Sequence, residues 1–190
     1  TMIEGAFSPD RLLQVLRDFV FYPDDSKKSE AIICRYPQFF AANKMLESLS
    51  QHKRPAGDGK GGIYFGATGC GKTYTMLFLS RQLMLRKKDV FHNPTIVLIT
   101  DREDLDTQTS KLFVTAKEYL HDKNIKSIES RDDLHDTLSN CESGGVYITT
   151  IQKFCESTGL LSDRSNIICI SDEAHRSNAG VNAKLKKTDK

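Results

Sequence analysis

The chain has 190 residues, of which 38% are hydrophobic and 27% charged, with a formal net charge of +2. This balance is typical of a folded domain and excludes a largely disordered chain, while the small net charge indicates no particular partner. The five cysteines lie far apart and form no Cys-x-x-Cys pair, which argues against a disulfide framework and a zinc site. No apolar run approaches the roughly 20 residues that cross a bilayer, so we expect a soluble protein of the reducing cytoplasm.

The N-terminal part of the chain contains two helical patterns. Ser8-Pro9-Asp10 is typical of a helix start, and apolar residues then recur at helical spacing, which predicts a helix over residues 9–21. Residues 22–30 are polar and include a proline, so we expect an exposed loop or linker. A second amphipathic helix is predicted from Pro37 onward, and the Gly, Pro and Asp residues of 52–62 close it.

After residue 62, short apolar runs alternate with longer helical patterns. We expect strands at 63–65, 95–100, 126–129, 145–150 and 166–171. Continuous apolar strands separated by helices are typical of a parallel sheet that is covered on both faces. The predicted fold class is therefore α/β, with three α/β/α layers.

The stretch GATGCGKT at 66–73 fits the phosphate-binding pattern G-x-x-x-x-G-K-[ST], between a predicted strand and a predicted helix. Its glycines permit positive φ, so successive N–H groups can point at an anion near the positive end of the following helix. We expect Lys72 to contact the β- and γ-phosphates of ATP and the Thr73 hydroxyl to bind Mg²⁺. The alternative is a chance glycine-rich turn. The predicted binding loop comprises Gly66, Ala67, Thr68, Gly69, Cys70, Gly71, Lys72 and Thr73.

Within this loop, Cys70 lies close to the start of the predicted helix, and a helix N-terminus lowers the pKa of a thiol. A reactive cysteine also needs a partner base, and none lies nearby in the sequence. We therefore interpret Cys70 as a small residue that contributes its backbone.

A second candidate site follows the predicted strand 166–171, where the sequence continues with Asp172-Glu173. A carboxylate at the carboxyl end of a parallel strand faces the crevice in which α/β sheets bind ligands, so Asp172 would bind the Mg²⁺ that Thr73 holds. Glu173 would orient or deprotonate the attacking water. An isolated Asp-Glu pair is usually a solvated turn, but together with the phosphate loop it predicts a nucleotide hydrolase.

Five blocks of the sequence, taken together, resemble the restriction (R) subunit of type I restriction-modification enzymes, which are motors of helicase superfamily 2. The blocks are RYPQFFAANK (35–44), GGIYFGATGCGKTYTM (61–76), LITDREDLDTQ (98–108), TTIQKF (149–154) and SDEAHRSNAG (171–180). The resemblance implies a RecA-like P-loop lobe over residues 31–190. Residues 1–30 would be a linking helix and loop that follow a nuclease domain.

The resemblance also implies roles for single residues. Gln38 would recognise adenine, Glu173 would activate water, and His175 would couple hydrolysis to DNA movement. The residues expected along the DNA path, which contact phosphates without reading sequence, are Asp101, Arg102, Thr150, Gln152 and Lys153. Arg102 and Lys153 also have a simpler interpretation as solvated surface charges. Many relatives have a serine at the position of Cys70.

By this resemblance, the protein would use ATP to translocate double-stranded DNA before cleavage, in a complex with methyltransferase (M) and specificity (S) subunits. No nuclease pattern precedes the lobe and no second lobe follows it, so we expect the chain alone to hydrolyse ATP slowly or not at all. One alternative is another superfamily 2 helicase or a type III restriction subunit. A different class, a non-catalytic docking module, would not need Lys72, Thr73, Asp172 and Glu173.

Overall fold

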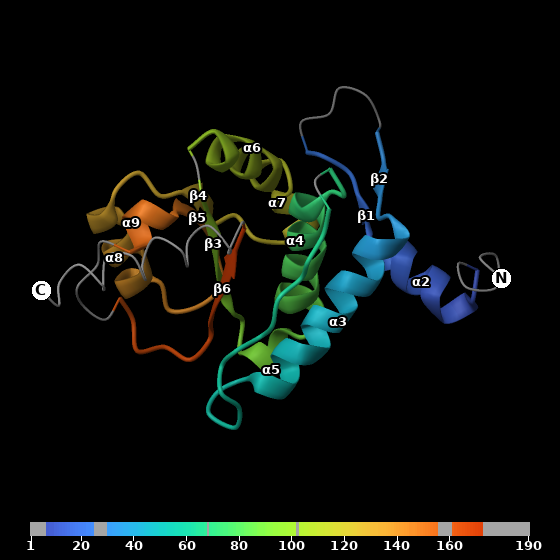
Figure 1. Cartoon of the computed structure of the whole chain (residues 1–190), viewed down its shortest axis with the longest axis horizontal. Coiled ribbons are helices and arrows are strands. Elements are labelled where there is room, and N and C mark those ends of the chain that lie inside the picture. Colours follow the sequence, from blue (N-terminus) through green and yellow to red (C-terminus); the bar gives the residue numbers. More distant parts are fainter. Residues whose placement is uncertain (1–6, 25–29, 68, 102, 156–160, 173–190) are drawn as a thin grey trace, which may run out of the picture. The chain divides into compact units, whose positions relative to one another are not determined.

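A computed structural model of the chain describes residues 7–24, 30–67, 69–101, 103–155 and 161–172 (Figure 1). The chain forms two compact units, which are described separately below. Unit 1 comprises residues 1–93 and 115–121, and unit 2 comprises residues 94–114 and 122–190. Among the described helices, none is long and apolar enough to cross a membrane.

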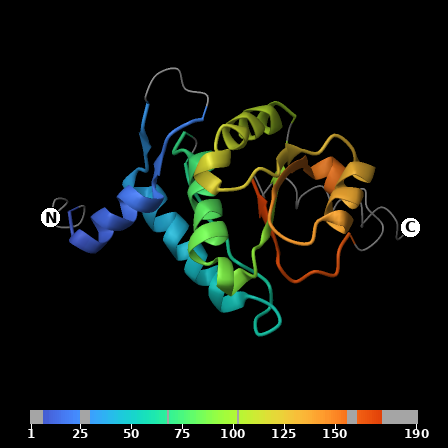
Figure 2. The ribbon, with the colours of Figure 1, turned by 180° about the vertical axis from the view of Figure 1, so that it is seen from behind.

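Unit 1 is mainly helical. Its elements are α2 (Pro9–Asp18), β1 (Val20–Phe21), β2 (Ile32–Ile33), α3 (Tyr36–His52), α4 (Lys72–Arg81), the π-helix η1 (Gln82–Arg86), α5 (Lys88–Phe91) and α7 (Lys117–Leu120). Helices α3 and α4 pack side by side, as both ribbon views show (Figures 1 and 2). The ring of Phe19 lies 4.9 Å from that of Phe39 and 5.4 Å from that of Phe78, so aromatic packing joins the three segments that carry them.

Two sequence predictions in unit 1 are wrong at the level of single elements. The first helix ends at Asp18 rather than at residue 21, because Val20 and Phe21 pair with Ile33 and Ile32 in an antiparallel ladder. Apolar spacing alone does not separate a last helical turn from a short strand. Residues 63–65 form no strand among the described residues, and Ile63 and Phe65 are 92% and 95% exposed. A three-residue apolar run between glycines becomes a strand only where a neighbouring strand pairs with it.

Unit 2 contains a parallel sheet of β3 (Thr95–Thr100), β4 (Ile125–Ser127), β5 (Val146–Thr150) and β6 (Ile167–Ser171), in the order β4-β5-β3-β6. Its helices are α6 (Glu103–Val114), α8 (Arg131–Asn140) and α9 (Ile151–Cys155). The strand predicted at 95–100 has those bounds, and the later three occur within a residue or two of their predicted limits.

The central strand β3 is buried along its whole length. Its side chains Val97 and Ile99 share one core cluster with Tyr147 of β5 and with Leu134 and Leu138 of α8. Helix α6 packs against β3, β4 and β5. A parallel sheet flanked by helices confirms the predicted α/β class.

Candidate nucleotide site

The predicted phosphate loop of unit 1 has the backbone that its glycines permit. Gly69 has φ 76° and Gly71 has φ 83°, both in the left-handed region, where a β-carbon costs about 1–2 kcal/mol. Gly71 is the residue immediately before α4, which starts at Lys72. The loop therefore turns directly into the first turn of a helix, which is the geometry that directs backbone N–H groups at an anion.

The charges around the loop favour an anion as well. The Lys72 ammonium lies 3.3 Å from the carbonyl oxygen of Gly66 and donates a hydrogen bond to it, so the lysine reaches back across the loop. The first turn of α4 contains no acidic residue that would neutralise the positive end of the helix dipole. The residues present thus fit a phosphate chain, with Lys72 as a point charge and Thr73 in the first turn of the helix.

Gln38 ties helix α3 to this loop. Its side chain is buried, its Oε1 accepts a hydrogen bond from the Arg35 N–H at 2.7 Å, and its Nε2 donates to the Gly71 carbonyl at 3.0 Å. One amide group therefore bonds both the start of α3 and the last residue before α4. The expected role in adenine recognition stays a prediction. The contact with Gly71 was not expected, because nothing in the sequence relates two residues that lie 33 positions apart.

The side chain of Cys70 also has a local neighbour. The Tyr64 hydroxyl lies 3.9 Å from the Cys70 sulfur. Burial and this contact with Cys70 raise the pKa of Tyr64. Cys70 thus contacts the segment that leads into the loop.

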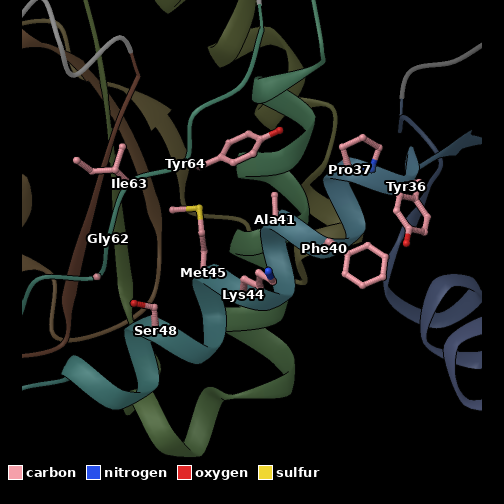
Figure 3. Close-up of a pocket in the computed structure, with 11 residues that line it drawn as sticks. Tyr36, Pro37, Phe40, Ala41, Lys44, Met45, Ser48, Gly62, Ile63 and Tyr64 are labelled. Atoms are coloured by element: carbon pink, nitrogen blue, oxygen red, sulfur yellow. The ribbon is translucent and has the colours of Figure 1, made fainter.

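A pocket of about 510 Å³ lies in unit 1 between α3 and the segment that precedes the loop. Figure 3 shows Tyr36, Phe40 and Met45 on helix α3, and Tyr64 on the opposite segment. Lys44 and Ser48 add polar groups to a lining that is mainly aromatic and apolar. No motif in the sequence marks this pocket, and the aromatic residues around Gln38 in RYPQFF are its one local signal.

In unit 2, three residues predicted to have functional roles lie at one edge of the sheet. Asp101 follows β3, Thr150 ends β5 and Asp172 follows β6, and the carboxyl ends of parallel strands meet at the same edge. The Asp172 N–H donates to the Ile99 carbonyl at 2.9 Å, and the Gln152 amide lies 3.5 Å from the Asp101 carbonyl. This edge therefore gathers the acidic and amide groups that lie far apart in the sequence.

Several side chains at this edge are buried or half-buried, although side chains that contact DNA are expected to be exposed to solvent. The Lys153 ammonium is half-buried and donates to the Ile128 carbonyl at 2.9 Å. Thr149 and Thr150 are both buried, and the Thr149 hydroxyl has no hydrogen-bond partner in the described part of the chain. A buried hydroxyl without a partner is unusual, because its desolvation is not offset.

Comparison with known proteins identifies the family to which the chain belongs. Residues 37–188 match the SWI2/SNF2 ATPase family. The chain belongs to this ATPase family. It is also similar to the type I restriction enzyme HindI endonuclease subunit of Haemophilus influenzae, with 37% identity over 97% of this chain and 18% of the relative. A putative type I restriction enzyme MjaIXP endonuclease subunit of Methanocaldococcus jannaschii is 33% identical over 95% of this chain and 17% of the relative. These comparisons confirm the resemblance to the R subunit, and the chain spans less than a fifth of either relative.

For this SWI2/SNF2 ATPase, the structure brings together only part of the predicted site. Gln38 and Gly71 meet in unit 1, while Asp101, Gln152 and Asp172 gather in unit 2. Four predicted residues lie outside the described part of the chain: Thr68, Arg102, Glu173 and His175. The roles of all the predicted site residues therefore stay predictions.

Proposed function

We propose that the chain is the ATP-binding motor lobe of a type I restriction endonuclease subunit that translocates double-stranded DNA before cleavage. The observation that carries the proposal is the loop at 66–73, with left-handed Gly69 and Gly71 and with Lys72 at the start of α4. The family match over residues 37–188 and the similarity to restriction subunits support it. Residues 31–190 would be this lobe, and residues 1–30 would link it to a preceding nuclease domain.

Each group of residues has one task in this proposal. The loop N–H groups and Lys72 would bind the phosphates of ATP. Thr73 and Asp172 would each supply an oxygen ligand to Mg²⁺, which would neutralise phosphate charge. Glu173 orients or deprotonates the attacking water, and His175 couples hydrolysis to DNA movement. The pocket beside α3, which Tyr36 and Phe40 help to line, would take the base.

The DNA would run along the carboxyl edge of the unit 2 sheet. Thr150, Gln152 and Lys153 lie at this edge with Asp101, and Arg102 directly follows Asp101 in the sequence. Such hydroxyl, amide and cationic groups contact phosphates and do not distinguish bases. The M and S subunits of the restriction complex would supply recognition of the DNA site.

Calorimetric titration with Mg-ATP tests the nucleotide site. We expect the unsubstituted chain to bind and Lys72→Ala to lose binding, because the substitution removes the point charge on the phosphates. Lys60→Ala is the matched control: Lys60 is exposed in the same unit and the change in net charge is the same. Equal binding by both variants would contradict the assignment of the loop.

The motor function needs the full-length subunit. We expect its ATPase to be stimulated by double-stranded DNA and abolished in Glu173→Gln, which keeps the side-chain size but removes the base. Stronger stimulation by RNA would favour another superfamily 2 motor. An absence of ATP binding and hydrolysis in the full-length subunit would favour the non-catalytic docking module.

A further inference from the structure

Helix α2 leaves part of its apolar surface exposed. Leu13 and Leu16, three residues apart and thus on one helix face, are 65% and 60% exposed. Phe7, just before the helix, is exposed as well. An amphipathic helix normally buries its apolar face and leaves its polar face in water. In α2 the arrangement is partly reversed, and Asp18 is the helix residue that is fully buried.

Polar contacts hold α2 in this orientation. The Gln14 amide donates to the Asn43 side chain of α3 at 2.8 Å, and the Arg11 guanidinium lies 5.5 Å from the centre of the Phe40 ring. At the end of the helix, the Asp18 carboxylate accepts a hydrogen bond from the Arg86 guanidinium at 2.5 Å. Rotation of the leucines into unit 1 would break these contacts and turn Asp18 away from Arg86, so the exposed face is a fixed feature of the unit.

Helix α2 lies outside the part of the chain that matches the SWI2/SNF2 ATPase family. The SWI2/SNF2 match begins at residue 37, after α2 has ended, whereas the Haemophilus influenzae restriction subunit is similar over 97% of the chain. Helix α2 is therefore an element that this chain shares with restriction subunits and that the ATPase match does not include.

We infer that the Leu13–Leu16 face of α2 is a docking surface for the part of the longer polypeptide that precedes residue 7. The inference rests on the proposed function, in which the chain belongs to a subunit about as long as its relatives, of which it spans less than a fifth. Two exposed leucines are a small surface, and a separate protein generally needs about 1,000 Å² for specific association. A domain joined directly to α2 needs much less, because the link gives it a high effective concentration.

Photo-crosslinking in the full-length subunit tests this inference. A benzoylphenylalanine replaces Leu16 in one variant, and in the control it replaces Asp10, which is exposed on α2 beside the apolar face. We expect a cross-link yield several-fold higher at Leu16 than at Asp10, within a single polypeptide, to a peptide from before residue 7. A cross-link between two copies, a cross-link to a different subunit, or equal yields at both positions would overturn the inference.

Mg-ATP binding by the same two variants separates the two proposals. Neither substituted residue belongs to the nucleotide site, so we expect both variants to bind as the unsubstituted subunit does. Retained binding without the Leu16 cross-link refutes the docking surface and leaves the proposed function standing. Absence of binding in the unsubstituted subunit refutes the proposed function itself.

Discussion

The loop contains two left-handed glycines that differ in their surroundings, and this difference predicts different effects of the same substitution. A β-carbon on Gly69 would meet no atom within 4 Å, whereas one on Gly71 would lie 2.4 Å from the Gln38 amide nitrogen. Both backbones have positive φ, 76° and 83°, so alanine carries a similar backbone strain at either position. Only Gly71→Ala also displaces the amide that bonds the Gly71 carbonyl.

The magnitudes follow from these two terms. Alanine in the left-handed region costs about 1–2 kcal/mol, which is the expected loss in the free energy of unfolding for Gly69→Ala. The hydrogen bond between Gln38 and Gly71 contributes about 0.5–1.5 kcal/mol, so Gly71→Ala should lose about 1.5–3.5 kcal/mol in all. In a Gln38→Ala background the extra loss should disappear, and Gly71→Ala should then cost no more than Gly69→Ala.

Guanidinium unfolding, followed by circular dichroism, measures these free energies, provided that the denaturant slope is constant. The proteins compared are the unsubstituted chain, Gly69→Ala, Gly71→Ala, Gln38→Ala and the double variant of Gln38→Ala with Gly71→Ala. Mg-ATP titration of the same proteins should show weaker binding for Gly71→Ala than for Gly69→Ala, since only the former moves the residue before Lys72. Equal losses for the two single substitutions would refute the idea that Gln38 holds the loop.

Two further predictions concern groups away from the loop. Asp18→Asn should lower the free energy of unfolding by about 2–4 kcal/mol, somewhat below a fully buried pair, because Asp18 is buried but its partners Arg86 and Arg17 are 34% and 57% exposed. Asp10→Asn, on the exposed side of the same helix, should cost less than about 1 kcal/mol in the same denaturation assay, and equal losses would refute the role of the buried pair. Burial raises the pKa of Cys34 to about 11, whereas at Cys141 burial is outweighed by hydrogen bonds that lower the pKa. Iodoacetamide should therefore modify Cys141 faster than Cys34 near pH 8, as read by mass spectrometry, and a faster reaction at Cys34 would contradict this order.

Much of unit 2 could be predicted because its signals are local. The run TIVLIT forms β3 at its expected bounds, since a continuous β-branched apolar run between polar residues has one favourable environment, a buried parallel strand. The left-handed backbone of Gly69 and Gly71 agrees with the loop that the sequence predicts, whereas its phosphate-binding role stays a prediction from the chemistry of its glycines, lysine and threonine.

Other features could not be predicted, because they depend on residues far apart in the chain. Residues 63–65 carry a strand-like pattern but have no pairing partner among the described residues, so pattern alone was insufficient. The bond from Gln38 to Gly71 joins residues 33 positions apart, and the bond between Arg86 and Asp18 joins residues 68 positions apart. Neither pair has a spacing that marks it as a contact.

By itself, the sequence determined the α/β class and the positions of the later strands along the chain, and it indicated a phosphate loop at 66–73, because periodicity and motif chemistry act over a few neighbouring residues. The tertiary structure alone decided that Gln38 holds the loop and that α2 leaves Leu13 and Leu16 exposed. The physical reason is that a side chain's burial depends on which residues from distant parts of the chain pack against it in the folded structure. In unit 1, Asp18 pairs with Arg86 and Gln14 bonds Asn43, whereas Leu13 and Leu16 stay exposed in the described part of the chain.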